Sequence, residues 1–272
     1  ILLYAYMNGY YSSRNIETAC KRDINFMYLL EGAHAPDHAT IARFRSLHFA
    51  PFAKNILAQM THILADNAEI SFQNIFIDGT KLEAAANKYT FVWKKAVTKN
   101  QQKLMDKIPA LFQEAEELFG IKILYGNLIK QYHLKKLWKK LKKLQAEEGI
   151  LFVTGIGKRK SLLQKKLEQL VEYMGRLKKY NQYLYIAGTR NSFSKTDYDA
   201  TFMRMKEDAM KNGQLKPAYN IQFGVDSEYV VWITAGSQPT DTTTLIPFLE
   251  SFKESVGHVY PNIVADSGYE SE

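Results

Sequence analysis

The sequence predicts an α/β protein in which an all-helical N-terminal domain precedes a mixed β-sheet that carries a long helical insertion. Three observations support this class. Apolar residues recur at helical spacing as far as about residue 68, a strand pattern then appears at 72–78, and strand patterns return only at 219–226. We therefore expect two domains, residues 1–70 and residues 71–272.

The first domain is predicted to consist of short helices. Asp37 follows Pro36 and can cap the start of a helix that projects Arg43 and Arg45. Such a helix suits the recognition element of a helix-turn-helix, which makes this domain a candidate DNA-binding domain. Several short helices with scattered arginines are equally compatible with plain core packing.

A further helix is expected from about residue 51 to residue 66. Its large apolar side chains recur every three or four positions, which places them on one face, and we expect this face to point into the core. The face consists of Phe52, Ile56, Met60 and Ile63.

The segment from about 96 to 190 is predicted to be a helical insertion, because it shows no strand pattern. Leucines recur every three or four positions from Leu134 to Leu144 and again from Leu163 to Leu177. A glycine-containing break separates the two runs. This arrangement predicts an antiparallel helical hairpin that buries the two leucine stripes against each other.

The remaining sheet elements follow the insertion. Strands are predicted at 219–226 and 229–235, and the two-residue link between them indicates an antiparallel hairpin. Asp241 can cap the next helix, which leads to a strand that ends just before Asp266. Asp226, at the hairpin turn, is expected to make local hydrogen bonds.

Another polar segment, 194–199, is expected to lie in a loop before a helix. In that position Asp197 can serve as the helix cap, and we assign no catalytic role to it or to Asp199.

Composition narrows the functional classes. The chain has 36 Lys and Arg against 28 Asp and Glu, a net charge of +8 that favours polyanionic partners, although a basic protein without a nucleic-acid partner fits the charge equally well. The one cysteine, Cys20, excludes an internal disulfide and fits a reducing cytoplasm. No apolar run approaches the roughly 18 residues of a membrane helix.

Two short runs of mainly β-branched or aromatic residues are each followed by an Asp and then by a glycine, at which the chain is expected to turn. Ile75–Ile77 precede Asp78, and Ile263–Ala265 precede Asp266. Adjacent strands of one sheet can bring two such acids to one edge, where carboxylates suit Mg²⁺, with Mn²⁺ as a substitute. We predict that Asp78 and Asp266 are catalytic and bind metal. A structural Asp-Gly turn is the alternative for each motif alone.

Four segments of the chain occur in an order typical of one family. They are PDHATIARFR at 36–45, DGTKLEAAANKYTFVWKK at 78–95, the segment 194–206 and ADSGYESE at 265–272. Together they resemble DDE transposases of the IS1182 group, within the IS4/IS5-like superfamily. Departures are small: Ala85 stands where that family usually has Asn, and Tyr198 where it usually has Pro.

The resemblance implies a ribonuclease-H-like sheet and metal-dependent phosphodiester cleavage and strand transfer at the ends of an insertion sequence. The implied partners are double-stranded terminal repeats, target DNA and a second copy of the chain, in the bacterial cytoplasm. The family's catalytic Glu follows its second Asp by many residues, whereas this sequence ends six residues after Asp266. We therefore expect an incomplete site, and a catalytically inactive DNA-binding protein or inhibitor remains the alternative to an enzyme.

Basic residues cluster where DNA is expected to bind. Lysines alternate with the leucines of the first hairpin helix, more basic residues crowd the hairpin turn, and others follow the first Asp among aromatic residues. Acids are sparse among them, which favours phosphate contact over a merely solvated helix face. The predicted DNA-binding residues are Arg43, Arg45, Lys81, Lys88, Lys94, Lys95, Lys135, Lys136, Lys139, Lys140, Lys158, Arg159 and Lys160.

Overall fold

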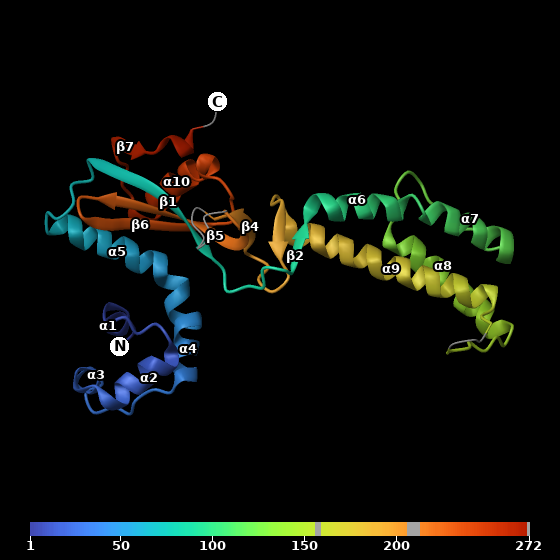
Figure 1. Ribbon diagram of the computed structural model, residues 1–272, viewed down its shortest axis with the longest axis horizontal. Coiled ribbons are helices and arrows are strands. Elements are labelled where there is room, and N and C mark those ends of the chain that lie inside the picture. The colour runs from blue at the N-terminus through green and yellow to red at the C-terminus, as the bar shows by residue number, and fades with distance from the viewer. Residues whose placement is uncertain (156–158, 206–212, 271–272) are drawn as a thin grey trace. The chain divides into compact units, whose positions relative to one another are not determined.

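The computed structural model describes residues 1–155, 159–205 and 213–270. They form N-terminal helices, a mixed five-stranded sheet and a group of long helices, so the α/β class is confirmed (Figure 1). In these three stretches, no helix has both the length and the apolar run that a membrane span requires. The chain divides into two compact units, one of residues 1–79, 222–234 and 242–272 and the other of residues 80–221 and 235–241.

The N-terminal helices begin at side chains that cap them. Asp37 Oδ1 accepts the backbone N–H of Thr40 at 2.6 Å, which confirms the predicted cap, and Ser12 and Asp23 cap the two earlier helices in the same way. A small separate core includes Ile16 and Phe26. The helices are α1 (Leu2–Met7), α2 (Ser13–Arg22), α3 (Ile24–Leu29) and α4 (His38–Phe44).

Helix α4 continues without a loop into three further helical segments. These are the π-helix η1 (Arg45–Phe49), the 3₁₀-helix η2 (Ala50–Phe52) and α5 (Ala53–Asp66). The face of α5 that packs on the sheet contains Ala58 and Thr61, and the Thr61 hydroxyl donates to the carbonyl of Val231 at 2.8 Å.

The prediction that the large apolar face of α5 points into the core was therefore wrong. The core instead takes the opposite side of the helix, where Ala58 and Thr61 are buried and Leu57 and Leu64 pack against the sheet core, so the side chains of the predicted face remain on the outer side. The exposed residues are Phe52, Ile56, Met60 and Ile63.

The main sheet has the strand order β4-β5-β1-β7, with β6 paired to β5. Strand β7 runs parallel to β1, and β4 runs antiparallel to β5. The predicted hairpin is confirmed: β5 and β6 are joined by Ser227 and Glu228, and Ser227 takes a φ of 56° in the turn. The strands are β1 (Asn74–Glu83), β4 (Thr201–Arg204), β5 (Leu215–Asp226), β6 (Tyr229–Gly236) and β7 (Asn262–Ala265).

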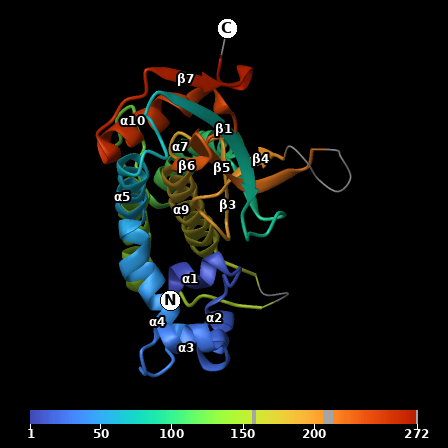
Figure 2. The same cartoon turned by 90° about the vertical axis from the view of Figure 1, so that its left-hand side faces the viewer.

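One face of the sheet is covered by helices within the first unit. Helix α10 (Leu245–Val256), which follows the 3₁₀-turn η3 (Asp241–Thr243), packs beside α5 (Figure 2). The shared core includes Ile75 and Phe248. Gly224 of β5 is needed for this packing, because a Cβ there would lie 2.7 Å from Phe248 and 2.8 Å from Ile75.

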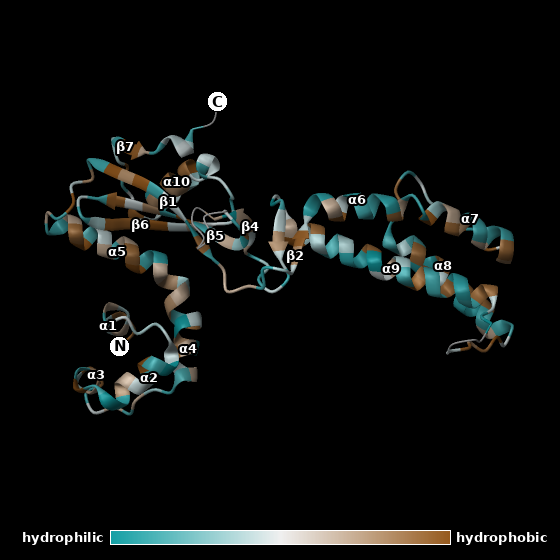
Figure 3. Cartoon of the chain, viewed as in Figure 1, coloured by the Kyte–Doolittle hydropathy of each residue, from teal (hydrophilic) through white to brown (hydrophobic). Residues whose placement is uncertain are grey.

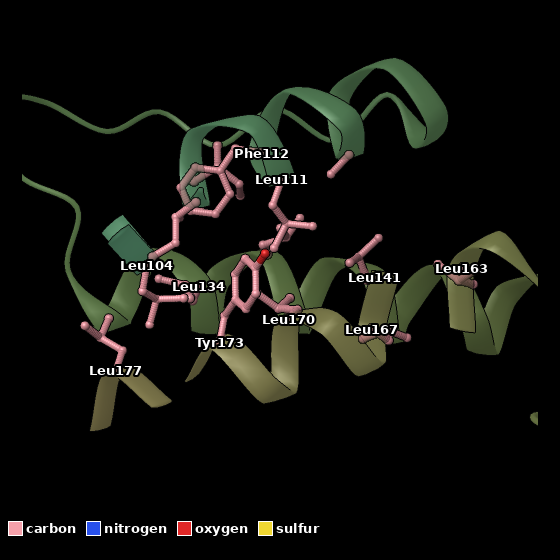
Figure 4. Packing of buried hydrophobic residues seen from close by; sticks show 14 residues of the cluster. Leu104, Leu111, Phe112, Leu134, Leu141, Leu163, Leu167, Leu170, Tyr173 and Leu177 are labelled. Atoms are coloured by element: carbon pink, nitrogen blue, oxygen red, sulfur yellow. The ribbon is translucent and has the colours of Figure 1, made fainter. Parts of the chain in front are cut away.

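The insertion has about the predicted extent but contains more helices than the predicted hairpin. The predicted hairpin is present as α8 (Gln131–Glu147) packed against α9 (Leu162–Ala187), and two more helices, α6 (Lys94–Met105) and α7 (Ile108–Phe119), join it. Figure 4 shows leucines of these helices meeting in one cluster with Phe112 and Tyr173. At the base of the insertion, β2 (Phe91–Trp93) pairs antiparallel with β3 (Ser192–Ser194).

Two expectations about acids require correction. The segment after Asp197 leads to strand β4 and not to a helix, so Asp197 does not cap a helix. The Asp197 carboxylate instead caps a turn by accepting the N–H groups of Asp199 and Ala200. It also accepts the Tyr219 hydroxyl at 2.8 Å. Burial and this carboxylate raise the pKa of Tyr219 to about 12.

Asp226, for which local hydrogen bonds were expected, also makes long-range ones. It is buried and accepts the backbone N–H of Phe72 and the hydroxyl of Tyr260, each at 3.1 Å. These bonds tie the end of β5 to segments that precede β1 and β7.

Candidate functional site

The two predicted catalytic acids lie on neighbouring strands. In the parallel pairing of β1 with β7, Ile77 lies opposite Ala265. Asp78 and Asp266 each follow by one residue, so they occupy equivalent positions where this pairing ends, and paired strands lie about 4.8 Å apart. Asp266 follows the end of β7, whereas β1 continues to Glu83, so the prediction that Asp78 ends its strand was wrong. The structure thus brings together two residues that are almost 190 positions apart in the sequence.

Both acids belong to the face of the sheet that α5 and α10 leave open. Side chains alternate along a strand, so Asp78 shares the face of Phe76, and Asp266 that of Val264. Phe76 and Val264 lie opposite each other and are about half exposed. Asp78 and Asp266 are themselves exposed, so a phosphate or a hydrated ion can approach them.

Each carboxylate is oriented by a backbone N–H that follows it. Oδ1 of Asp78 accepts the N–H of Gly79 at 2.7 Å, and Oδ1 of Asp266 accepts the N–H of Gly268 at 2.9 Å. Gly268 allows this approach, because a Cβ there would lie 2.9 Å from the same oxygen. Oδ2 of each acid accepts no hydrogen bond from the residues that the structure describes.

Tyr269 fixes the turn after Asp266, a role that sequence analysis did not assign. It ends the 3₁₀-turn η4 (Ser267–Tyr269), its ring is buried in the core under the sheet, and its hydroxyl donates to the side-chain oxygen of Gln222 on β5. The quoted motif already contains this tyrosine. Its pairing with Gln222 could not be read from the sequence, because the two are 47 residues apart.

The donor set at this edge of the sheet fits a divalent cation through two carboxylates. Carboxylate oxygens on rigid strands are the ligands that Mg²⁺ prefers. Within 1–155, 159–205 and 213–270, no group of three or more His, Cys, Asp or Glu side chains is placed to hold a metal ion. The two acids alone are therefore suited to weak ion binding.

Positive charge is concentrated in the insertion. Residues 94–187 contain 21 Lys and Arg against 8 Asp and Glu, a net charge of +13. The other residues contain 15 against 20, a net charge of −5. The basic character of the chain therefore resides in one helical element, as a phosphate-binding surface requires.

The four α8 lysines that were predicted to bind DNA all lie on its exposed side. Lys135, Lys136, Lys139 and Lys140 are solvent-exposed, whereas the leucines between them are buried. The hydropathy colouring shows this division along α8 and α9 (Figure 3). The hairpin turn is less uniform, since Lys160 pairs with Glu168 at 2.6 Å, Arg159 is exposed and Lys158 lies outside the described residues.

The lysines after the first Asp occupy different environments. Nζ of Lys81 donates to the carbonyl of Arg204 at 3.0 Å, and Lys88 lies over the ring of Tyr89. At the start of α6, Nζ of Lys94 donates to the carbonyl of Gly188 at 2.5 Å, whereas Lys95 is exposed. A surface pocket there is lined by Lys94, Lys95, Thr98, Lys99 and Asn191. Sequence analysis omitted Lys99, although it lies one turn after Lys95.

The two arginines near the end of α4 differ in their surroundings. Arg43 is exposed. Arg45 is held inside its own domain, because Nη2 donates to the carbonyl of Tyr11 at 3.0 Å and the guanidinium lies over the ring of Tyr6. Arg43 is thus better placed for an external ligand than Arg45.

Comparison with known families identifies the N-terminal part of the chain. Residues 1–47 match the family model of a transposase domain, DUF772. This transposase domain contains α1 to α4 and most of the π-helix, and it implies an interaction with DNA. No curated protein and no solved structure matched the chain.

Proposed function

We propose that this chain is part of a DDE transposase of the IS1182 group and that its sheet is the beginning of a ribonuclease-H-like fold. The transposase domain at 1–47 supports this proposal. So does the strand arrangement, in which a hairpin lies on one side of β1 and the parallel strand β7 on the other.

The parallel register of β1 and β7 is the observation that carries the proposal. It gives Asp78 and Asp266 equivalent positions on one face of neighbouring strands, where their pairing ends. An Asp-Gly sequence does not by itself require a second acid in this register. Two acids with purely local roles would therefore leave the juxtaposition unexplained.

The proposed roles follow from the geometry. Asp78 and Asp266 would hold Mg²⁺ or Mn²⁺ through their outward oxygens, and Tyr269 would keep Asp266 in place through Gln222. A bound divalent ion supplies Lewis acidity at a phosphodiester oxygen during in-line displacement. The lysines of α8 would hold the phosphates of double-stranded terminal repeats or target DNA.

A non-catalytic DNA-binding protein is the second candidate. It is favoured by the donor set, since two carboxylates among the described residues position one ion but not the pair used in two-metal phosphoryl transfer. On either proposal, residues 1–272 bind duplex DNA and show little or no cleavage with Mg²⁺ or Mn²⁺. Robust cleavage that depends on Asp78 would rule out the non-catalytic candidate and would also contradict the expectation that the site is incomplete.

Direct measurement of ion binding tests the proposed site without relying on activity. We expect calorimetry with Mn²⁺ to detect one weak site that is lost in Asp78→Asn and in Asp266→Asn. Asp66→Asn, which removes an exposed acid from the end of α5, is the matched control and should leave binding unchanged. If Mn²⁺ binds equally well without either strand-end acid, the shared metal site is wrong.

A further inference from the structure

Helix α5 carries apolar side chains on two opposite faces. The first face packs on the sheet through Ala58 and Thr61. The second is a single row along the outer side of the helix, because its members recur every three or four residues. This row, called here the α5 stripe, consists of Phe52, Ile56, Met60 and Ile63, which are 57%, 38%, 52% and 53% exposed.

The exposed apolar surface extends toward the N-terminus. Phe44 and Leu47 are 50% and 60% exposed, and the helical segments from α4 to α5 follow one another without a loop. At roughly 150–250 Å² for a large side chain, the α5 stripe exposes on the order of 400 Å² of apolar surface, and these two residues add to the total. An exposed apolar row of that size marks an interaction site.

The chemistry of the α5 stripe excludes DNA as its occupant. The residues between its members on the outer side are uncharged, as at Asn55 and Gln59. Lys54 is the cation next to the stripe, and its Nζ donates to the Ser251 hydroxyl of α10 at 3.3 Å. Binding to a phosphate backbone depends on cations, and this one is held against α10. The occupant must therefore offer an apolar surface of similar length, about 16 Å from Phe52 to Ile63 at 1.5 Å per residue.

Charges at the two ends of this helical region select the orientation of the occupant. The N-terminal end carries the exposed Arg43, and the C-terminal end carries the exposed Asp66 and Glu69. When two such helices pair antiparallel, each acidic end faces a basic end, whereas parallel pairing places like charges together. The surface is thus complementary to itself about a two-fold axis.

We propose that the α5 stripe is a dimer interface that binds the same stripe of a second copy of this chain in antiparallel orientation. The two-fold axis passes between Ile56 and Met60. Ile56 of one copy therefore contacts Met60 of the other, and Phe52 of one copy contacts Ile63 of the other. An area on the order of 400 Å² per copy is smaller than the roughly 800 Å² of a standard interface, so the dimer is of micromolar rather than nanomolar affinity. The inference is independent of the proposed metal site and of DNA binding.

Sedimentation equilibrium of the whole chain without DNA tests the interface. The wild-type chain is expected to be mainly dimeric at about 100 µM, and Ile56→Glu with Met60→Glu should weaken dimerisation at least a hundredfold by burying like charges. The matched control is Ile246→Glu with Val259→Glu, two exposed apolar positions of the same unit outside the stripe. A monomeric wild-type chain, or a stripe variant that dimerises normally, overturns the proposal.

Cross-linking provides a second test that does not place charge in the interface. Cys20 is buried, so an introduced cysteine is the accessible thiol. Gln59→Cys lies next to the proposed axis and should form a disulfide-linked dimer under mild oxidation. Asp66→Cys lies about 24 Å from its counterpart along the helix axis, at 1.5 Å per residue, and should not form a disulfide-linked dimer. Cross-linking at both positions, or at neither, contradicts the antiparallel arrangement.

Discussion

The helical insertion and the sheet that bears the two acids differ in charge and in how their cores are assembled. The insertion, residues 94–187, has a net charge of +13 and a core formed by helices that follow one another in the sequence. The sheet core joins α5, β1, β6 and α10, which are far apart in the chain, and its reactive groups are acidic. Each region has its own core, so the surface suited to phosphate binding and the acids suited to metal binding can be altered separately.

Charge reversal on α8 is expected to have the largest effect on function. Replacing Lys135, Lys136, Lys139 and Lys140 with Glu should lower affinity for duplex DNA at least a hundredfold and for all sequences alike, because each lost phosphate contact abolishes the release of a counterion. Fluorescence anisotropy over a range of salt concentrations measures both the affinity and its salt slope.

A control with the same number of reversed charges makes this experiment specific. Lys195→Glu with Lys253→Glu reverses two exposed charges outside the insertion and should lower affinity far less than Lys135→Glu with Lys139→Glu does. If the α8 variant keeps its affinity and salt slope, the insertion is a structural element and DNA binds elsewhere.

Loss of packing in the insertion should remain local to it. Leu137 is fully buried among the insertion helices, so Leu137→Ala should destabilise them by about 2–5 kcal/mol. Hydrogen exchange should show reduced protection in α8 and α9 and unchanged protection in β1. Ile75→Ala in the sheet core is the reciprocal control. Equal loss of protection in both regions would show that the two cores unfold together.

The smallest expected effect concerns the pH stability of the transposase domain. The Glu17 carboxylate accepts hydrogen bonds from Lys21 at 2.5 Å and from the backbone and ring of His38, and these contacts lower its pKa from 4.5 to about 2. The folded state thus favours the ionised form. The resulting stabilisation is present above pH 4.5 and disappears as the pH falls toward 2.

Comparison of Glu17→Gln with the wild-type chain measures this contribution. The wild type should show greater hydrogen-exchange protection in α2 and α4 at neutral pH, and the difference should vanish between pH 4.5 and 2. Glu31→Gln is an exposed control in the same domain. A difference that persists at pH 2 would mean that Glu17 stabilises the domain by some means other than its charge.

Much of the fold could be predicted from local sequence patterns. The Asp37 cap, the β5–β6 hairpin, the strand that leads to Asp266 and the packing of α8 against α9 were all predicted correctly. Each depends on residues close in sequence. Short strands β2, β3 and β4 were missed, because three or four residues give too little alternation to detect.

The candidate site was predictable only in part. Two similar motifs identified Asp78 and Asp266 as candidate acids, and the register of β1 with β7 then placed them side by side, although β1 continues past Asp78 to Glu83. The anchor at Tyr269 and Gln222 could not be predicted, because it depends on how a turn meets a distant strand. Among the predicted DNA contacts, the sequence could not distinguish exposed Arg43 from Arg45, whose guanidinium packs within its own domain.

By itself, the sequence indicated which segments are helices or longer strands with an apolar face, which two acids follow apolar strand residues and where positive charge is concentrated. Tertiary structure alone decided what each face contacts. In α5 the periodicity correctly grouped Phe52, Ile56, Met60 and Ile63 on one side, yet the core took the opposite side, with Ala58 and Thr61. Periodicity defines a face, but the burial of that face depends on the shape of the surface that packs against it, which distant residues supply.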